Sequence, residues 1–275
     1  MALAWKASGL IAHEGSNPSS SENYFLDIEC RDEKMINFFN NFPEILAVLS
    51  EREDGSMRLI QNGGGDSNSE NRKKFFEKIG IGEKKVIAAK LAHTTRVEIV
   101  DRSSPNFFED TDGLVTKDAN IYLSVTVADC IPVFLFDPGR KIVGVLHCGW
   151  RGIVAGIIES AIEKMSQLEG EPKNLKIVLG PGICKRHFEI KDDVLNEFGK
   201  YSKYTERSGG KIFVDLKGII KKQLDVSGVR SENVEDIREC TVENLNYFSY
   251  RRDKSKEVKA MAAVIGRKKQ NIIKI

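Results

Sequence analysis

Two histidines and one cysteine are the residues of this sequence whose types and spacing could do chemistry. His93 and His147 each end an apolar run, and Cys130 lies just before another. One thiolate and two imidazoles are a ligand set for a catalytic zinc ion that keeps its fourth position open. A cysteine beside a histidine can equally be a nucleophile with its general base. We therefore take His93, Cys130 and His147 as candidate metal ligands and as candidate catalytic residues.

A purely structural interpretation of these residues also stays open. Cys130 and Cys148 can be buried small apolar side chains, with the histidines satisfied by backbone groups. Cys148 should point away from His147 on a strand, so we expect it to be structural. Asp129 is either a carboxylate that orients His147 or a cap of a turn. The remaining cysteines lack a neighbouring histidine and the next histidine follows a Gly-Pro-Gly turn, so structural and surface roles are expected for Cys30, Cys184, Cys240 and His187.

The elements that must position the candidate site are predicted from apolar periodicity. Strands are expected at Glu44–Glu51, Lys85–His93, Thr95–Asp101, Ile121–Val127, Ile131–Phe136, Lys141–Leu146, Leu175–Leu179 and Ala260–Ile265. Helices are expected at Arg72–Ile79, from Gly152 to Met165 as one helix, at Lys191–Phe198 and at Leu216–Leu224. Asp112-Gly113 and Asp137-Pro138-Gly139 are typical of turns. The pattern predicts one α/β domain with mixed sheets and flanking helices.

Bulk composition limits the partners of the chain. Its 275 residues carry 42 basic and 40 acidic side chains, and a net charge of +2 creates no field that would attract nucleic acid or a membrane surface. No uncharged apolar run approaches the roughly 20 residues of a membrane helix. Five cysteines, an odd number, do not make a disulfide framework in a chain of this length. We expect a cytoplasmic protein that is a monomer or a homodimer.

Several segments resemble the YfiH-like proteins, also called the multicopper polyphenol oxidoreductase (laccase-domain) family, which includes the purine nucleoside phosphorylase family of the human laccase-domain protein. The similar segments, in order, are ADCIPVFLFD, VGVLHCGWRGIVAGI, VLGPGICKRHFEI, FVDLKGIIKKQL and Cys240-Thr241 followed by FSYRRD. The resemblance covers Leu46 to Ile265. It implies a YfiH-like fold, related to that of a toxin deamidase with a Cys/His pair, over residues 41–275. A variable N-terminal segment, residues 1–40, precedes it.

The resemblance also implies an activity. It assigns zinc to His93, Cys130 and His147, and phosphate-dependent cleavage of adenosine, inosine, guanosine and S-methyl-5′-thioadenosine to the protein. Adenosine deamination is implied as a side activity. Arg52, where the family keeps an arginine, is the preferred phosphate ligand, and Arg151 after the His147 turn is a second candidate. The partners so implied are purine nucleosides and phosphate.

Other classes of function compete with this one. Copper oxidation of phenols is disfavoured, because a multicopper centre needs many histidines and the chain has four. A metal-independent cysteine hydrolase would use Cys130 to attack an amide or ester, with His147 as base. A non-catalytic binding protein would result if the departures from the family pattern at Leu59 and Leu91–Thr94 had closed the site. The basic clusters at 251–254 and 267–269 are expected to be solvated surface and not nucleic-acid contacts.

Overall fold

The structure is a computed structural model that describes residues 37–59 and 68–268. Most of the expected variable segment, with Cys30, therefore lies outside the described residues. Of residues 37–40, Phe38 and Phe39 are buried in the core. The described residues belong to one compact body.

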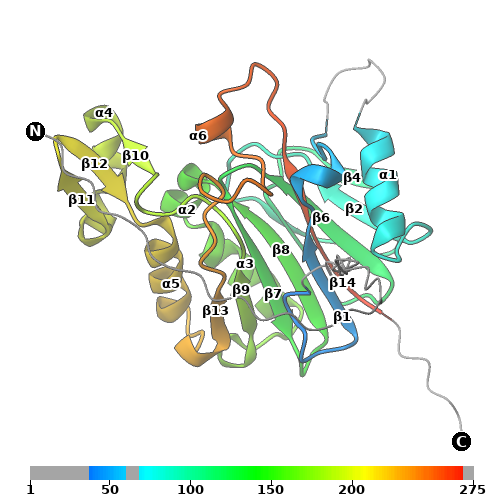
Figure 1. Ribbon diagram of the computed structural model, residues 1–275. Helices are drawn as coiled ribbons and strands as arrows, with labels where there is room; N and C mark the ends of the chain where they lie inside the picture. Colours follow the sequence, from blue (N-terminus) through cyan, green and yellow to red (C-terminus); the bar gives the residue numbers. More distant parts are fainter. Residues whose placement is uncertain (1–36, 60–67, 269–275) are drawn as a thin grey trace, which may run out of the picture. The chain divides into compact units, whose positions relative to one another are not determined.

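A five-stranded sheet carries one half of the site. Its strand order is β1-β14-β6-β2-β4, where β14 pairs antiparallel with β1 and β6, and β2 runs parallel to β6 and β4 (Figure 1). Because β2 and β6 are parallel, the segments that follow both strands leave the same edge of the sheet. The strands are β1 (Ile45–Leu49), β14 (Met261–Arg267), β6 (Ile121–Val127), β2 (Lys85–Ala89) and β4 (Phe107–Phe108).

A six-stranded sheet carries the other half. Its strands are β13 (Val234–Asp236), β9 (Lys176–Leu179), β7 (Ile131–Asp137), β8 (Ile142–Cys148), β5 (Gly113–Thr116) and β3 (Val97–Ile99), in this spatial order. The hairpin expected between β7 and β8 is confirmed. Its turn is held by Asp137, whose Oδ1 accepts hydrogen bonds from the amides of Gly139 and Arg140 at 2.8 and 2.9 Å.

The two sheets pack face to face, and alternation along β7 shows how. Phe134 and Phe136 pack with residues of the five-stranded sheet, whereas Val133 and Leu135 pack against helices on the other face. Successive side chains of a strand point to opposite faces, so a strand covered on both faces must be apolar throughout. All seven residues of β7 are buried, as its continuous apolar run predicts.

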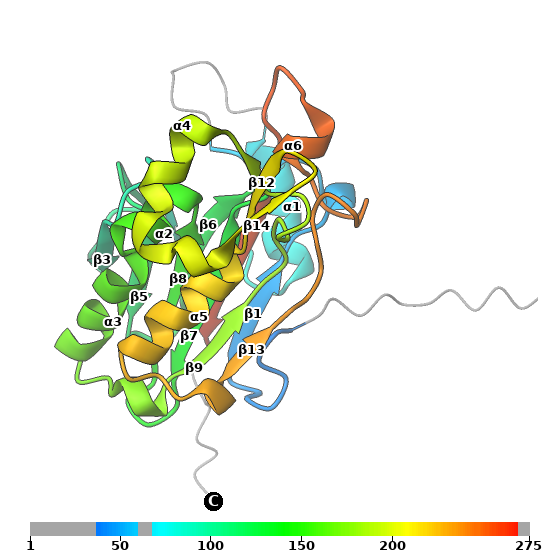
Figure 2. The same cartoon turned by 90° about the vertical axis from the view of Figure 1, so that its left-hand side faces the viewer.

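Helices cover the outer faces of both sheets. Figure 2 shows α3 and α5 on the outside of the six-stranded sheet, and α1 packs its Phe75 on the outside of the other sheet. The single helix expected after Gly152 is wrong: Gly156 has φ +99° and separates two helices. A left-handed residue breaks helical hydrogen bonding, and glycine takes that conformation at little cost. The longer helices are α1 (Ser69–Lys78), α2 (Trp150–Ala155), α3 (Ile157–Gln167) and α5 (Leu216–Val226).

A small three-stranded sheet was not expected from the sequence. It pairs β10 (Glu189–Ile190), β12 (Lys211–Val214) and β11 (Thr205–Ser208). The helix expected at Lys191–Phe198 is instead α4 (Asp192–Leu195) followed by a 3-10 segment, and α6 (Tyr250–Asp253) lies near the chain end. The fold is therefore a single α/β domain with mixed sheets, as predicted. Over the described residues, no helix is long and apolar enough to cross a membrane.

Candidate active site at the edge of two sheets

The topology brings the three candidate residues to one end of the sheets. Cys130 lies in the connection by which the chain leaves β6 in one sheet and enters β7 in the other. His147 is the penultimate residue of β8, where it pairs in register with Pro132 near the start of β7. His93 follows β2, which is parallel to β6, so it reaches the same edge. In Figure 1 this edge is the end of β6 and β8 near α2 and α6.

The three side chains converge on one point. The Sγ of Cys130 and one ring nitrogen each of His93 and His147 lie within 4.8 Å of one another. The two imidazole rings are nearly perpendicular, with centroids 4.9 Å apart. Gly149 lies beside them: an added Cβ would lie 2.9 Å from His93 Cδ2, 3.3 Å from Cys130 Sγ and 3.4 Å from His147 Cε1. The glycine is therefore required for the convergence.

A buried carboxylate that the sequence analysis did not assign to the site holds both histidines. Oδ1 of Asp112 lies 2.7 Å from His147 Nδ1 and accepts the His93 amide at 3.1 Å. Its Oδ2 accepts the Ala92 amide at 3.2 Å and both the amide and the hydroxyl of Thr94, at 2.8 and 3.0 Å. His93 has φ +58°, so these bonds stabilise a strained loop. Asp112 was expected to be a turn residue, and it is instead completely buried.

Asp112 also determines which nitrogen of His147 is available. With Nδ1 turned to the carboxylate, Nε2 is left to face Cys130. Carboxylate–histidine pairs of this kind orient metal-binding imidazoles and increase their basicity. His147 is buried, Cys130 half-buried and His93 exposed, so the site is open to solvent on the His93 side. The donor set, its orienting carboxylate and its open side fit a zinc ion with three protein ligands.

Cys130 and His147 influence each other's protonation. Burial alone would raise the pKa of the Cys130 thiol, but the charge on His147 and hydrogen bonds from both histidines lower it to about 6. Burial alone would lower the pKa of His147, but the Cys130 thiolate and Asp112 raise it to about 9. Near neutral pH the pair is therefore a thiolate beside an imidazolium. The thiolate is already a nucleophile. Both residues can bind a metal ion once the imidazolium loses its proton.

Asp129 has a structural role instead of the orienting role considered for it. Its Oδ1 accepts the Thr241 hydroxyl and its Oδ2 accepts the Arg251 amide, both at 2.6 Å. Its backbone oxygen accepts the Ile183 amide at 2.9 Å. Asp129, which directly precedes Cys130, thus holds three later segments of the chain. Asp112, not Asp129, orients His147.

The two arginines expected to bind substrate have partners within the chain. Arg52 donates to Asp253 Oδ2 at 2.7 Å and to the Tyr247 carbonyl at 3.1 Å, and its guanidinium stacks 4.8 Å from the Phe248 ring. It lines an open pocket of about 240 Å³ together with Ser249, Tyr250, Asp253, Ser255, Glu257, Val258 and Lys259. Arg151 is exposed and stacks on Trp150, 4.3 Å from the ring centroid. A role in substrate binding stays a prediction for both.

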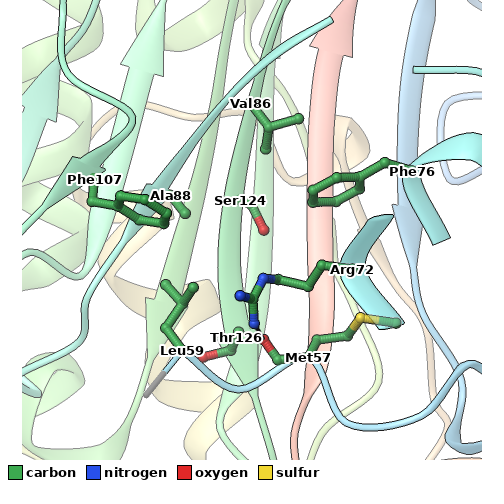
Figure 3. A pocket seen from close by; sticks show the side chains of 9 residues that line it. All are labelled: Met57, Leu59, Arg72, Phe76, Val86, Ala88, Phe107, Ser124 and Thr126. Carbon is green, nitrogen blue, oxygen red and sulfur yellow. Dashed lines mark hydrogen bonds between the residues drawn. The ribbon is translucent and has the colours of Figure 1, made fainter. Parts of the chain in front are cut away.

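A second, mainly apolar pocket lies outside the three candidate residues. Figure 3 shows it between α1 and the strands β2 and β6, with the side chains of Met57, Leu59, Arg72, Phe76, Val86, Ala88, Phe107, Ser124 and Thr126 around it. None of His93, Cys130 and His147 lines it. Its volume of about 70 Å³ is well below the roughly 300 Å³ at which ligand pockets begin. It therefore does not accommodate a nucleoside.

Cys184 and Cys240 were expected to lack a histidine neighbour, but His187 lies beside both of them. Together with Glu243 they form a second group whose ligand atoms lie within 4.8 Å of one another. Cys184 and His187 are three positions apart, as are Cys240 and Glu243, so the spacing was a usable signal. The sequence did not show that two loops more than fifty residues apart would meet.

Known proteins resemble this chain in sequence and in fold. Residues 62–268 match the family model described as multi-copper polyphenol oxidoreductase laccase. The chain belongs to this family. A purine nucleoside phosphorylase of Mycobacterium bovis is 33% identical over 185 residues, which cover 66% of this chain and 73% of the relative. One of Deinococcus radiodurans is 32% identical over 200 residues, covering 72% and 76% of the two chains.

Two further relatives broaden the comparison. Adenosine deaminase RL5, from an unknown prokaryotic organism, is 29% identical over 189 residues, covering 63% of this laccase-family chain and 72% of the relative. The crystal structure of YfiH from Bacillus licheniformis superposes with a TM-score of 0.74 at 26% identity, covering 85% of this chain and 96% of that one. The relatives are thus named for reactions of purine nucleosides, and the fold is that of YfiH.

Proposed function

We propose that this chain is a zinc-assisted purine nucleoside phosphorylase with adenosine deaminase side activity, acting in the cytoplasm. The observation that carries the proposal is the convergence of His93, Cys130 and His147 beside Gly149, with Asp112 orienting His147. The relatives named for these two reactions support the substrate class. Adenosine, inosine, guanosine and S-methyl-5′-thioadenosine are the proposed substrates.

The ligand set suits zinc better than copper. Zinc bound by His93, Cys130 and His147 would supply a Lewis acid that polarises an oxygen at the reacting centre. Asp112 keeps the proton of His147 on Nδ1 and so leaves Nε2 directed at the centre. The exposed side of His93 leaves room for substrate to approach. A multicopper centre needs many imidazoles. The described residues offer only the pair His93 and His147 and, in a separate group, His187.

Phosphate recognition is proposed for the arginines. A guanidinium binds phosphate in bidentate fashion, and Arg52 already holds an anion of similar geometry, the Asp253 carboxylate. Phosphate binding there would displace Asp253 from the guanidinium. Arg151 is the second residue of α2, just after the strand that carries His147. Its side chain is exposed and can therefore change rotamer to reach a phosphate.

The test is a product assay on adenosine with zinc-loaded protein, run with and without phosphate and read by mass spectrometry. Adenine and ribose 1-phosphate formed only with phosphate would establish phosphorolysis, and inosine formed in both reactions would establish deamination. Methylthioadenosine is assayed in parallel. No product from either nucleoside would contradict the proposal.

The geometry also favours a second candidate, a cysteine hydrolase that needs no metal. The lowered pKa of Cys130, the raised pKa of His147 and the Asp112 contact make the arrangement of a thiol, a base and an orienting carboxylate. In this scheme Cys130 attacks an amide or ester carbonyl. A chelator separates the two candidates: it stops the zinc-assisted reaction and leaves thiol-dependent hydrolysis intact.

A further inference from the structure

Two loops beside the active site place four potential metal ligands together. The loop after β9 carries Cys184 and His187, and the loop after β13 carries Cys240 and Glu243. Each loop therefore contributes a cysteine and a second ligand three positions later, a spacing found in zinc sites. The main chains of the loops are joined by a parallel β-bridge between Gly182 and Cys240.

The four ligand atoms lie within 4.8 Å of one another, and several of their separations are close to those around a tetrahedral ion. His187 Nδ1 lies 3.3 Å from Cys184 Sγ, 3.6 Å from Cys240 Sγ and 3.4 Å from Glu243 Oε1. Cys184 Sγ lies 3.9 Å from the same carboxylate oxygen. Zinc bonds of about 2.0 to 2.3 Å at tetrahedral angles separate neighbouring ligands by about 3.3 to 3.8 Å. Only small side-chain rotations would be needed to close the set.

We propose that Cys184, His187, Cys240 and Glu243 bind one zinc ion as a structural site. Two thiolates and an imidazole are soft to borderline donors, which favour zinc over magnesium or calcium. Four protein ligands fill a tetrahedral coordination sphere, so the ion has no position left for substrate. This site is separate from the His93, Cys130 and His147 group and does not depend on the reaction that group performs.

The surroundings of the four ligands suit a bound cation. The Cys184 amide donates to Cys240 Sγ at 3.3 Å, a contact that stabilises a thiolate. Arg186 donates to Glu243 Oε1 at 2.6 Å and holds the carboxylate in the group. Two thiolates and one carboxylate carry three negative charges, which Zn²⁺ and the Arg186 guanidinium would neutralise. Cys240 is buried and Glu243 exposed, so the ion can enter from solvent.

The position of this site indicates what the ion would do. Asp129 accepts the Ile183 amide from the first loop and the Thr241 hydroxyl from the second, and it precedes Cys130. An ion that joins the two loops would fix the positions of Ile183 and Thr241, the two hydrogen-bond donors to Asp129. The second site would thereby hold Asp129, and with it the adjacent Cys130, in place through main-chain and side-chain contacts and not through substrate.

The experiment is a metal titration of the full chain, stripped with a chelator under reducing conditions. Zinc stoichiometry is measured with a chromophoric competitor, and Co²⁺ absorption reports thiolate ligation. We expect two equivalents for the unmodified chain, one for Cys130→Ser and one for His187→Gln. In Cys130→Ser the remaining Co²⁺ band must show thiolate-to-metal charge transfer. The added change Cys184→Ser must weaken this band, and Cys184→Ser together with Cys240→Ser must remove it. Cys148→Ala, which removes a buried thiol outside both groups, should retain two equivalents.

The outcomes are separable even if a variant folds poorly. His187→Gln and Glu243→Gln change half-exposed side chains, and both variants should give the same circular dichroism in chelator as the unmodified chain. The unmodified chain could bind one equivalent of zinc that is lost in His187→Gln and kept in Cys130→Ser. This result would support the second site and contradict zinc at the first. One equivalent that only Cys130→Ser abolishes would overturn the second site. A Cys184–Cys240 disulfide that re-forms after reduction and blocks binding would overturn it as well.

Discussion

The two histidine–cysteine groups of this protein differ in where each places its carboxylate. At the first, Asp112 stands behind His147 and is completely buried, so three ligands are left facing a side open to solvent. At the second, Glu243 belongs to the ligand group itself and its side chain is 44% exposed. An orienting carboxylate leaves a coordination position open, whereas a ligating carboxylate fills it. The difference supports the proposals of a catalytic role for the first group and a cross-linking role for the second.

The largest expected effect tests the first group. We expect Cys130→Ala to lower turnover of adenosine by more than about 10³-fold, because it removes both a metal ligand and the only nucleophile of the group. Thermal unfolding should change little, since the half-exposed thiol contributes little packing. Cys148→Ala serves as the control for loss of a thiol in the neighbouring strand. A folded Cys130→Ala protein with full activity would contradict both the zinc and the nucleophile interpretations.

The next effect tests the role of Asp112. Asp112→Asn should lower zinc affinity at the first site and turnover by about 10 to 100-fold, because the amide cannot accept all five hydrogen bonds that the carboxylate accepts. The matched control is Asp137→Asn, since Asp137 is also buried and binds backbone amides, but at the β7–β8 turn. Asp137→Asn should lower the free energy of unfolding and leave zinc affinity unchanged. Equal losses of zinc affinity in both variants would remove the distinction.

Much of the first site could be predicted because its residues end apolar runs. The limits of β6 follow the predicted Ile121–Val127, and the hairpin turn at Asp137 is as expected. Such strands are specified locally by β-branched and aromatic residues, so their ends, and with them Cys130 and His147, can be read from the chain.

The features that the sequence did not predict depend on distant contacts. Asp112 looks like a turn residue because its partners, His93 and His147, lie 19 and 35 positions away. The break at Gly156 interrupts a helical pattern that is itself continuous, so periodicity alone cannot locate it. Cys184 and Cys240 lie 56 positions apart, and the parallel pairing of β13 with β9 brings their loops together.

A smaller effect is expected at the glycine beside the first group. Gly149→Ala should lower zinc affinity at that site by about 10-fold, because the new Cβ would lie 2.9 Å from His93 Cδ2 and displace the ring. Gly199→Ala is the control, since an added Cβ there meets nothing within 4 Å. Among the glycines that the structure describes, none would place a Cβ against the second group, so the affinity of that site should stay the same in Gly149→Ala. Loss of affinity at both sites would indicate that they are one coupled unit.

The smallest effect distinguishes the second region by its response to acid. Burial alone would raise the pKa of Asp236, but hydrogen bonds from Lys217 and Lys221 outweigh it and lower the pKa below the usual 3.8. A carboxyl whose pKa is lower in the folded state stabilises the fold above its ordinary pKa, and that contribution disappears as pH falls through the folded value. These bonds hold the strand that leads to Cys240, where Lys217 also donates to the Ile237 carbonyl. Unfolding free energies measured between pH 6 and pH 3 should therefore converge for the unmodified chain and Asp236→Asn in acid, from a difference of at most about 1 kcal/mol near neutrality. The control is Asp192→Asn, which removes an exposed ion pair with Arg207 and should follow the unmodified chain at every pH. A constant difference in unfolding free energy for Asp236→Asn over the whole pH range would show that packing, not charge, connects α5 to the second site.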